Sequence, residues 1–409
     1  MGPSDLLTRG IANVIPRTLA KQKLESGQAI RIYWGIDPTG RTLHLGHSVA
    51  LRKLRSFADS GHDVVIVIGS FTATIGDPTG QDAMRVPLTR AQVEANFESY
   101  KDQVKKILDF TKVEVRYNHE WLEKLTFEDI AKLASHFTVQ QMSERDMFAK
   151  RLTEGKPVGM HEFLYPLMVG YDSVVLDVDC ELGGSDQEFN MLAGRTLQKA
   201  YGKREKFIIT TKIVEGTDGR KMSKSYGNCV YLTDSPKDMY GKILALKDNL
   251  IPIYMECCTD IPMEDVKQAE KDLKARRGNP KDLKMHLARE IVTLYHGREK
   301  AIQAEEEFER VFSKKGLPED IRTMKAEKGS LLLDVLIEGK LASSKAEAKR
   351  LMTQGGVKVH EKTVKALDAL LEDGITPEAL EAGVIVKVGK RKFLRVKSTH
   401  SSGWKARHV

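Results

Sequence analysis

The feature that most constrains the fold is the alternation of apolar, β-branched runs with amphipathic helical patterns through the first half of the chain. Repeated strand–helix units favour a parallel sheet covered by helices on both faces, and ligands bind such sheets at the carboxyl ends of the strands. The expected strands are IRIYWGI (30–36), VVIVIG (64–69), VEVRY (113–117), SVVLDV (173–178) and KFIITTKIV (206–214), and the expected helices span residues 48–60, 90–110 and 186–201.

The second half of the chain changes character twice. From about residue 232 the β-rich segments stop, and charged amphipathic helical patterns continue to about residue 314. The polar stretch KKGLPEDIRTMKAEKGS then marks a boundary. Beyond it, Ser344 and Glu347 have the spacing of a helix-capping box, and VIVKVGKRKFLRV predicts a hairpin that turns at Gly389 and Lys390. The sequence therefore predicts an α/β segment over 1–231, a helical segment over 232–325, a small α+β segment over 329–397 and a basic tail over 398–409.

Composition narrows the class of protein. The 409 residues carry a net charge of +8, and residues 329–409 hold 15 Lys and Arg against 9 Asp and Glu, a balance that allows a polyanionic partner. The chain has no apolar run near the roughly 18 residues of a membrane span, and no apolar block with a cleavage site near its start. The four cysteines show no metal-ligand spacing. We therefore expect a cytoplasmic protein with no membrane segment and with reduced, mostly structural thiols.

Two histidines lie in the stretch GIDPTGRTLHLGHSVALRKL, residues 35–54. His44 and His47 follow a strand and a DPTG turn and come directly before a helical pattern, so they should lie near a helix N-terminus. Backbone N–H groups and the helix dipole favour anions there, and Gly46 allows a ligand to approach the backbone. The stretch indicates a phosphate or nucleotide site in outline, although two ordinary surface or capping histidines would explain it equally well.

A second candidate element is GRKMSKSYGN, residues 219–228, which follows the last expected strand. The segment is rich in Gly, Ser and Lys, so a mobile loop is expected. Lys221 and Lys224 could bring positive charge to a polyphosphate when this loop closes. When this segment is considered alone, an exposed basic loop explains it better than a phosphate-binding site does.

Together, HLGH and KMSKS across an alternating α/β segment resemble the signatures of the class I aminoacyl-tRNA synthetases. The segments YWGIDPTGRTLHLGH, ATIGDPTG, YPLMVGYDSV and LGGSDQEFN resemble, in this order, the bacterial tyrosyl-tRNA synthetase family. The resemblance spans essentially the whole chain, and the C-terminal part resembles a small RNA-binding domain shared with a ribosomal small-subunit protein. It implies a Rossmann-like, doubly wound catalytic domain, an α-helical anticodon-binding region and a small α+β RNA-binding domain.

The resemblance also implies the reaction. Tyrosine and ATP, with Mg²⁺ bound to the ATP and no permanent cofactor, would give tyrosyl-adenylate, and tRNA(Tyr) would then accept the tyrosyl group. The attacking carboxylate is ionised at neutral pH, so positioning and charge stabilisation can supply the catalysis without a general base. A homodimer is implied as well, and we place its contact around residues 115–160.

Site residues follow by matching positions in the motifs. The expected catalytic contacts to the phosphates and ribose are His44, His47, Thr39, Lys221, Lys224 and Arg85. Further expected ATP-binding residues are Gly46, Asp37, Gly184, Asp186, Met222 and Ser223. The expected tyrosine-binding residues are Tyr33, Asp77, Tyr165, Asp172, Gln187 and Val169. The expected RNA-binding residues are Lys345, Lys349, Arg350, Lys390, Arg391 and Lys392.

Within this assignment, Tyr33 and Asp172 would bind the substrate phenol. Two side chains that hydrogen-bond the tyrosine hydroxyl lose this partner when phenylalanine binds. Such a site can favour tyrosine over phenylalanine by roughly 10⁴- to 10⁵-fold without editing. Three positions depart from the family pattern. Val169 stands where the family usually has a glutamine, Gln81 replaces a frequent lysine, and Trp34 is bulky beside the expected ribose.

Two alternatives remain open at this point. A tryptophanyl-type synthetase would share the fold and both signatures, but the Tyr33 and Asp172 pair and the basic C-terminal segment disfavour it. A synthetase-like RNA-binding or splicing factor without catalysis would have no need for both phosphate-binding motifs.

Overall fold

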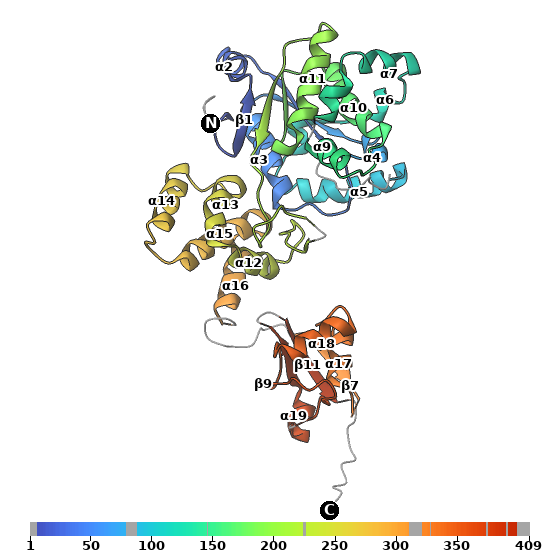
Figure 1. Ribbon diagram of the computed structural model, residues 1–409. Helices are drawn as coiled ribbons and strands as arrows, with labels where there is room; N and C mark the ends of the chain where they lie inside the picture. Colours follow the sequence, from blue (N-terminus) through green and yellow to red (C-terminus); the bar gives the residue numbers. More distant parts are fainter. Residues whose placement is uncertain are drawn as a thin grey trace, which may run out of the picture. The chain divides into compact units, whose positions relative to one another are not determined.

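The computed structural model describes most of the chain in two compact units, residues 1–305 and 306–409, and each unit is described by itself (Figure 1). The described residues are 6–78, 88–144, 146–223, 226–310, 321–327, 329–373, 375–389 and 392–398.

The first unit is built on a six-stranded sheet in the order β1-β6-β5-β2-β3-β4. Strands β2 to β6 run parallel to their neighbours, and β1 pairs antiparallel with β6 at one edge. The predicted parallel sheet is confirmed, with one antiparallel edge strand added. Its strands are β1 (Ile11–Ile15), β2 (Arg31–Ile36), β3 (Asp63–Ile68), β4 (Val113–Tyr117), β5 (Cys180–Gly184) and β6 (Phe207–Thr211).

The strand order reverses between β2 and β5. From β2 the chain continues outward through β3 and β4 on one side, and β5 is followed by β6 on the other. Doubly wound sheets bind their ligands at the carboxyl ends of the strands at such a switch point. The topology alone therefore places a site after Ile36 and Gly184.

Helices surround this sheet, and α10 and α11 lie side by side beside it (Figure 1). Two glycines allow this close approach, because a Cβ on Gly170 would lie 2.9 Å from Leu197 Cδ1 and 3.1 Å from the Gly194 nitrogen. The helices of this part are α2 (Arg17–Glu25), α3 (Leu45–Asp59), α4 (Thr72–Ile75), α5 (Arg90–Val104), α6 (His119–Leu122), α7 (Phe127–Ala134), α8 (Val139–Ser143), α9 (Asp146–Thr153), α10 (Met160–Leu176) and α11 (Glu188–Ala200).

One predicted strand is wrong. Residues 173–178 were expected to form a strand, but α10 continues through Leu176, and the strand is the next segment, Cys180–Gly184. A short apolar run has no periodicity that separates a buried helix from a buried strand. The two glycines at the end of β5 have low strand propensity, so the residue pattern of this segment does not predict a strand.

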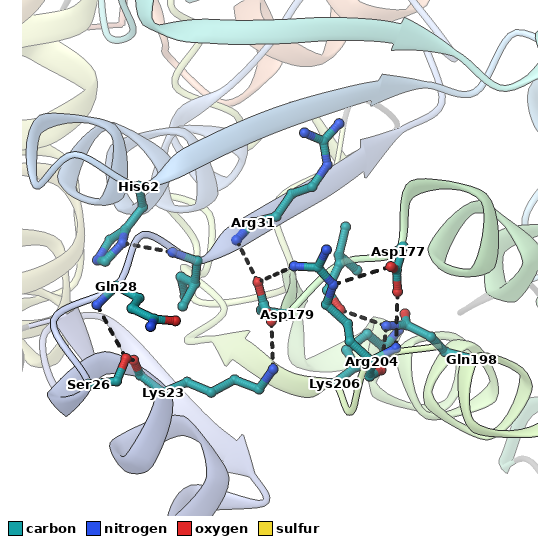
Figure 2. A network of polar contacts seen from close by, with 12 residues as sticks. Lys23, Ser26, Gln28, Arg31, His62, Asp177, Asp179, Gln198, Arg204 and Lys206 are labelled. Atoms are coloured by element: carbon teal, nitrogen blue, oxygen red, sulfur yellow. Dashed lines mark hydrogen bonds and ion pairs between the residues drawn. The ribbon is translucent and has the colours of Figure 1, made fainter. Parts of the chain in front are cut away.

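A polar network joins several elements at the amino-terminal ends of the central strands, opposite the carboxyl ends where a site is expected (Figure 2). The Asp179 carboxylate accepts hydrogen bonds from Lys23 Nζ (2.6 Å), the Arg31 backbone N–H (2.8 Å) and Arg204 (3.0 Å). Burial alone would raise the pKa of Asp179, but these hydrogen bonds and the charges of Lys23 and Arg204 lower it below its usual value. The network therefore ties α2 and the start of β2 to the residue that precedes β5 and to the segment between α11 and β6.

The rest of the first unit is helical, as expected. The helices here are α12 (Pro236–Leu244), α13 (Ile251–Cys258), α14 (Met263–Lys274), α15 (Pro280–His296) and α16 (Arg298–Phe308), of which α16 runs past the unit boundary at residue 305, and no strand lies in the described part of 232–310. Gly297 directly follows α15 as its C-cap residue, and its φ of +88° favours glycine. All four cysteines are free and buried, which agrees with structural thiols. None of the described helices is long and apolar enough to cross a membrane.

The second unit packs helices on a five-stranded sheet in the order β7-β11-β10-β8-β9. The predicted hairpin is confirmed, because Val388 pairs with Lys392 across a turn that begins at Gly389; Lys390 lies outside the described residues. The elements are β7 (Thr323–Ala326), α17 (Leu332–Glu338), α18 (Lys345–Thr353), β8 (Val357–Val359), β9 (Lys362–Thr363), α19 (Pro377–Ala382), β10 (Val384–Val388) and β11 (Lys392–Ser398).

The predicted capping box at the start of α18 is confirmed in one half only. Ser344 Oγ accepts the Glu347 backbone N–H at 3.2 Å, as a cap should. The Glu347 carboxylate turns to the preceding residue and accepts the Ser343 backbone N–H at 2.7 Å. The four-segment division of the chain expected from the sequence remains a prediction.

Candidate active site

A cavity of about 270 Å³ opens at the carboxyl ends of β2 and β5, where the topology places a site. Ten of the residues predicted from the sequence line it: Asp37, Thr39, His47, Asp77, Tyr165, Val169, Asp172, Gly184, Asp186 and Gln187. The structure thus brings together residues from β2, the start of α3, the middle of α10 and the end of β5.

The histidine pair forms the N-terminus of α3. His44 is the N-cap residue, and its backbone N–H donates to Nδ1 of His47 at 3.2 Å. The two rings lie 3.9 Å apart between centroids, tilted by 41°. A Cβ on Gly46 would lie 2.9 Å from His44 Nδ1, so glycine leaves room for this ring arrangement. The predicted location at a helix N-terminus is confirmed, and it favours an anionic ligand.

The histidine turn is joined directly to the segment that follows the KMSKS loop. The Leu45 N–H donates to the Val230 carbonyl and the Leu232 N–H donates to the Leu43 carbonyl, both at 2.9 Å. These two backbone hydrogen bonds fix the far end of the loop beside His44. The sequence gives no indication of this contact, because the segments are almost 190 residues apart.

The ends of the KMSKS loop are held by Asn228. Its Nδ2 donates to Asp218 (2.8 Å) and to the Lys221 carbonyl (3.1 Å), and its Oδ1 accepts the Ser223 N–H (2.9 Å). The hydrogen bond from Asn228 and those from Arg220 lower the pKa of Asp218. Met222 is buried and, like Ser223, does not line the cavity. Lys224, Arg85 and Gln81 lie outside the described residues.

Two carboxylates, those of Asp37 and Asp77, line the same cavity. Asp37 accepts hydrogen bonds from Thr72 Oγ1 (2.7 Å) and from the Tyr165 hydroxyl (2.9 Å), and Asp77 accepts one from Gln187 Nε2 (2.9 Å). Burial first, and then the charges of Asp37 and Asp77, raise the pKa of Tyr165 well above its usual value. Two fixed carboxylates in a partly buried cavity suit a cationic group of a ligand.

Gly69 is required for this arrangement. A Cβ at this position would lie 1.7 Å from Asp37 Oδ1 and 2.5 Å from Thr72 Oγ1. Any side chain there would displace the carboxylate. Gly69 was not among the residues predicted from the sequence.

The inner end of the cavity is formed by one face of α10. Tyr165, Val169 and Asp172 recur at positions i, i+4 and i+7, so their side chains point the same way. Asp172 is only 3% exposed and accepts hydrogen bonds from Trp121 Nε1 (2.8 Å) and Asn118 Nδ2 (3.3 Å). Burial raises the pKa of Asp172 well above its usual value in spite of these two donors.

Tyr33 does not line the cavity, although the motifs predict it at the substrate phenol. Its side chain is fully buried, and its hydroxyl lies 3.0 Å from Ser173 Oγ and 3.4 Å from the Val169 carbonyl. Its ring packs among Val65, Val67, Trp121, Leu122, Leu176 and Val178. Tyr33 therefore lies behind the cavity wall, and Glu181, which was not among the predicted residues, lines the cavity from the neighbouring strand β5.

The described residues contain no group of three or more His, Cys, Asp or Glu side chains that could hold a metal ion. In the second unit, three of the expected RNA contacts, Lys345, Lys349 and Arg350, are exposed on α18. Lys392 is anchored by a 2.9 Å hydrogen bond to the Leu341 carbonyl. Lys390 and Arg391 lie outside the described residues.

The doubly wound sheet, the histidine turn at its switch point and the lysine-bearing loop define a class I aminoacyl-tRNA synthetase. A family model described as "tRNA synthetases class I (W and Y)" matches residues 25–313. A second, described as "Tyrosine--tRNA ligase SYY-like C-terminal domain", matches residues 307–396.

Curated relatives narrow the family further. A tyrosine–tRNA ligase of Carboxydothermus hydrogenoformans is 45% identical over 403 residues, covering 96% of this chain and 97% of the relative. One of Thermotoga maritima is 44% identical over 392 residues, covering 96% of each. The chain belongs to the class I tRNA synthetases for tryptophan and tyrosine and, within them, to the tyrosine–tRNA ligases.

Solved structures agree on the fold. A C-terminally truncated mitochondrial tyrosyl-tRNA synthetase of Aspergillus nidulans matches with a TM-score of 0.61 at 23% identity, over 74% of this chain and 91% of that one. The tyrosyl-tRNA synthetase of Archaeoglobus fulgidus, complexed with L-tyrosine, matches with a TM-score of 0.60 at 21% identity, over 74% of this chain and 98% of that one.

Proposed function

We propose that this protein activates tyrosine with ATP to form tyrosyl-adenylate and then transfers the tyrosyl group to the terminal adenosine of tRNA(Tyr). One observation carries the proposal. A single cavity joins a histidine at a helix N-terminus, a carboxylate paired with the KMSKS-loop lysine, and a buried carboxylate at its inner end. Family membership over nearly the whole chain supports the same activity.

The nucleotide binds in the part of the cavity that is lined by the N-terminus of α3 and by the carboxyl ends of β2 and β5. The tyrosine carboxylate attacks the α-phosphorus and pyrophosphate leaves, so negative charge builds up on the phosphate oxygens. His47 and the N-terminus of α3 stabilise this charge, and Thr39, exposed at the rim, adds a hydroxyl donor. Gly184 and Asp186 hold the ribose, and Mg²⁺ enters with ATP as part of the substrate.

The amino acid lies deeper in the cavity. Asp37 and Asp77 bind its α-ammonium group, and Tyr165 positions the Asp37 carboxylate through its hydroxyl. Gln187 positions Asp77 in the same way. From there the aromatic ring extends inward and brings its hydroxyl to Asp172, which Trp121 and Asn118 hold in place.

RNA binding is assigned to two regions. The first is the basic surface of α18 in the second unit. The second is a groove of about 1120 Å³ in the first unit, and its basic lining residues are Arg9, Lys212, Lys267, Lys274, Arg276 and Arg277. Phosphate contacts of this kind provide most of the affinity for RNA and weaken as salt rises.

We also propose a homodimer formed through the segment 115–160. Several large apolar side chains there are exposed to an unusual degree: Phe127 (88%), Met160 (76%) and Val139 (75%). Exposed apolar side chains that gather in one segment favour a protein–protein contact. Sedimentation at micromolar concentration tests this assignment. A cytoplasmic location is proposed on the grounds of the tRNA substrate.

ATP–pyrophosphate exchange with each amino acid tests the proposed function. We expect exchange with tyrosine and none above background with tryptophan. Exchange with tryptophan alone would instead indicate the tryptophanyl reaction. Absence of exchange with every amino acid, with RNA binding retained, would indicate an RNA-binding protein without catalysis.

A further inference from the structure

All charged residues on the strands of the second unit are basic. The five strands hold no Asp or Glu, and their basic residues are Lys325, Lys358, Lys362, Lys387, Lys392, Arg395 and Lys397. The helices α17, α18 and α19 carry the acidic residues Asp334, Glu338, Glu347, Glu378 and Glu381. The sheet is therefore the positively charged layer of this unit.

Strand alternation places most of these cations on one face of the sheet. The valine and leucine residues of β8, β10 and β11 are buried in one core with residues of α17 and α18. Successive side chains of a strand point to opposite faces, so the residues between them lie on the face away from both helices. We call this surface the outer sheet face; its residues are Lys325, Lys358, Ile385, Lys387, Phe393, Arg395 and Lys397.

Carboxylates do not neutralise the outer sheet face. In the described part of the unit, Lys358 alone among its cations forms an ion pair, with the exposed Glu361 at 4.0 Å. An exposed pair of this kind contributes little. Lys358 and Lys325 are separated by three strand spacings and four residues along the strands, which is about 20 Å. The face therefore offers cations over a length that suits several phosphates of a nucleic acid.

An aromatic ring lies among these cations. Phe393 is partly exposed, and Nζ of its register partner Lys387 lies 5.1 Å from the ring centroid. Lys358 flanks Lys387 on β8, and Arg395 follows Phe393 two residues along the same strand. Proteins that bind unpaired nucleic acid combine such elements, because a base stacks on the aromatic ring while cations bind the flanking phosphates.

A glycine makes room for two of the cations. A Cβ on Gly383 would lie 2.8 Å from Cγ of Arg395 and 3.3 Å from Cγ of Lys397. The aliphatic stems of both side chains therefore pack against the Gly383 backbone at the start of β10. The φ of Gly383 is +104°, a conformation that also favours glycine.

We infer that the outer sheet face binds a stretch of unpaired RNA, with one base stacked on Phe393 and the flanking phosphates bound by the surrounding cations. Charge complementarity selects a polyanion, and the exposed ring selects one whose base faces are accessible, which a duplex does not provide. A second copy of this chain would bring like charges together. The outer sheet face lies on the other side of the sheet from α18, so either RNA-binding surface can fail without the other.

Fluorescence anisotropy with the full chain tests this inference. The probes are a labelled oligouridylate of about 12 nucleotides and an RNA duplex of the same length. In Phe393→Leu the Kd for the oligouridylate should rise by about 5-fold or more, with the Kd for the duplex changed by less than about 2-fold. In the double variant Lys387→Gln with Arg395→Gln, the slope of log Kd against log salt should fall by about 1–1.5.

Lys340→Gln is the control, because it removes an exposed charge that follows α17 on the other side of the sheet. It should change neither the Kd nor the slope by a measurable amount. Equal weakening of oligouridylate and duplex in Phe393→Leu would overturn the stacking role. Oligouridylate binding that is lost in the α18 variant Lys345→Ala, Lys349→Ala, Arg350→Ala and kept in both sheet variants would overturn the inference.

A measurement on the wild type covers the case in which the sheet variants do not fold. An oligouridylate with a single 4-thiouridine, irradiated in complex with the full chain, should crosslink to the peptide that contains Phe393. An excess of a polyglutamate peptide should displace this RNA only weakly, since it provides charge without bases. Crosslinks confined to other peptides, or displacement by polyglutamate as complete as by unlabelled RNA, would contradict the inference.

Discussion

Lys221 and Asp186 form an ion pair beside the cavity, in which Nζ of the lysine lies 2.9 Å from the carboxylate. The KMSKS loop is thereby docked on a residue that lines the nucleotide end of the cavity. Both side chains are partly exposed, and an ion pair of this kind contributes only about 0–1 kcal/mol. An incoming triphosphate can therefore replace the carboxylate as the partner of Lys221 at little cost.

Replacement of this lysine should reduce the chemical step far more than substrate binding. In Lys221→Met we expect kcat for adenylate formation to fall by about 10- to 100-fold, with the KM for ATP changed by less than about 3-fold, because the ammonium acts mainly on charge that develops in the transition state. Stopped-flow measurement of adenylate formation provides both values.

Arg220→Met is the matched control for this prediction. It removes a neighbouring positive charge whose guanidinium is paired with Asp218 and lies over the Tyr226 ring. We expect a change of less than about 3-fold in the same rate. Equal losses in the two variants would mean that general loop charge, and not Lys221, provides the effect.

The Asp179 network should stabilise the fold in a pH-dependent way. Because the folded-state pKa of Asp179 is lowered, its contribution is complete above the unfolded value of about 3.9 and is lost as pH falls through the lower folded value. Asp179→Asn should reduce the free energy of unfolding by about 1–3 kcal/mol at pH 7.

Urea unfolding at pH 7, 5 and 3.5 measures this difference between the wild type and Asp179→Asn. The difference should be similar at pH 7 and 5 and smaller at pH 3.5. A difference that grows as the pH falls would contradict the sign of the shift.

The histidine turn, the hairpin of the second unit and the helical segment could be predicted because local rules decide them. A strand, a DPTG turn and an apolar helical period fix the start of α3 within a few residues, and hence the place of His44 and His47. Residues 173–178 could not be assigned in this way, because an apolar run of six residues fits a buried helix or a buried strand equally well.

The sequence predicts which residues belong to the site, but it does not predict where their side chains point. Motif matching predicts that Tyr33 and Asp172 bind the substrate phenol; Asp172 lines the cavity, whereas Tyr33 is fully buried behind its wall. Whether a side chain faces the cavity or the core depends on its neighbours, and here Ser173 and the Val169 carbonyl draw the Tyr33 hydroxyl away. Glu181 was not predicted because it matches no motif, and only the structure shows that it lines the cavity.

Val169 lines the cavity where a family glutamine is usual, so an amide there should add a hydrogen bond to the charged α-ammonium group. Val169→Gln should lower the KM for tyrosine by about 10-fold or more, since a hydrogen bond to a charged group contributes roughly 1.5–3 kcal/mol. Exchange assays over a range of tyrosine concentrations measure this change. An unchanged or higher KM would contradict the assignment of this part of the cavity to the ammonium group.

RNA affinity should depend on the basic face of α18. Replacing Lys345, Lys349 and Arg350 together with alanine should weaken tRNA binding and reduce the slope of log Kd against log salt by about 2–3. Filter binding between about 50 and 200 mM salt measures both values. Lys365→Ala, an exposed position in the same unit, is the control and should leave the slope nearly unchanged. A triple variant with the wild-type slope would exclude this helix as a phosphate contact.

The central claim is that donors fixed at the N-terminus of α3 stabilise the transition state of adenylate formation. Since Nδ1 of His47 accepts the His44 N–H, His47→Asn keeps an acceptor near that position and removes the outer ring nitrogen. Single-turnover adenylate formation tests the claim most directly. We expect the rate to fall by about 10²- to 10³-fold with the dissociation constants of tyrosine and ATP changed by less than about 3-fold. A rate close to that of the wild type, or a loss found entirely in ATP affinity, would contradict it.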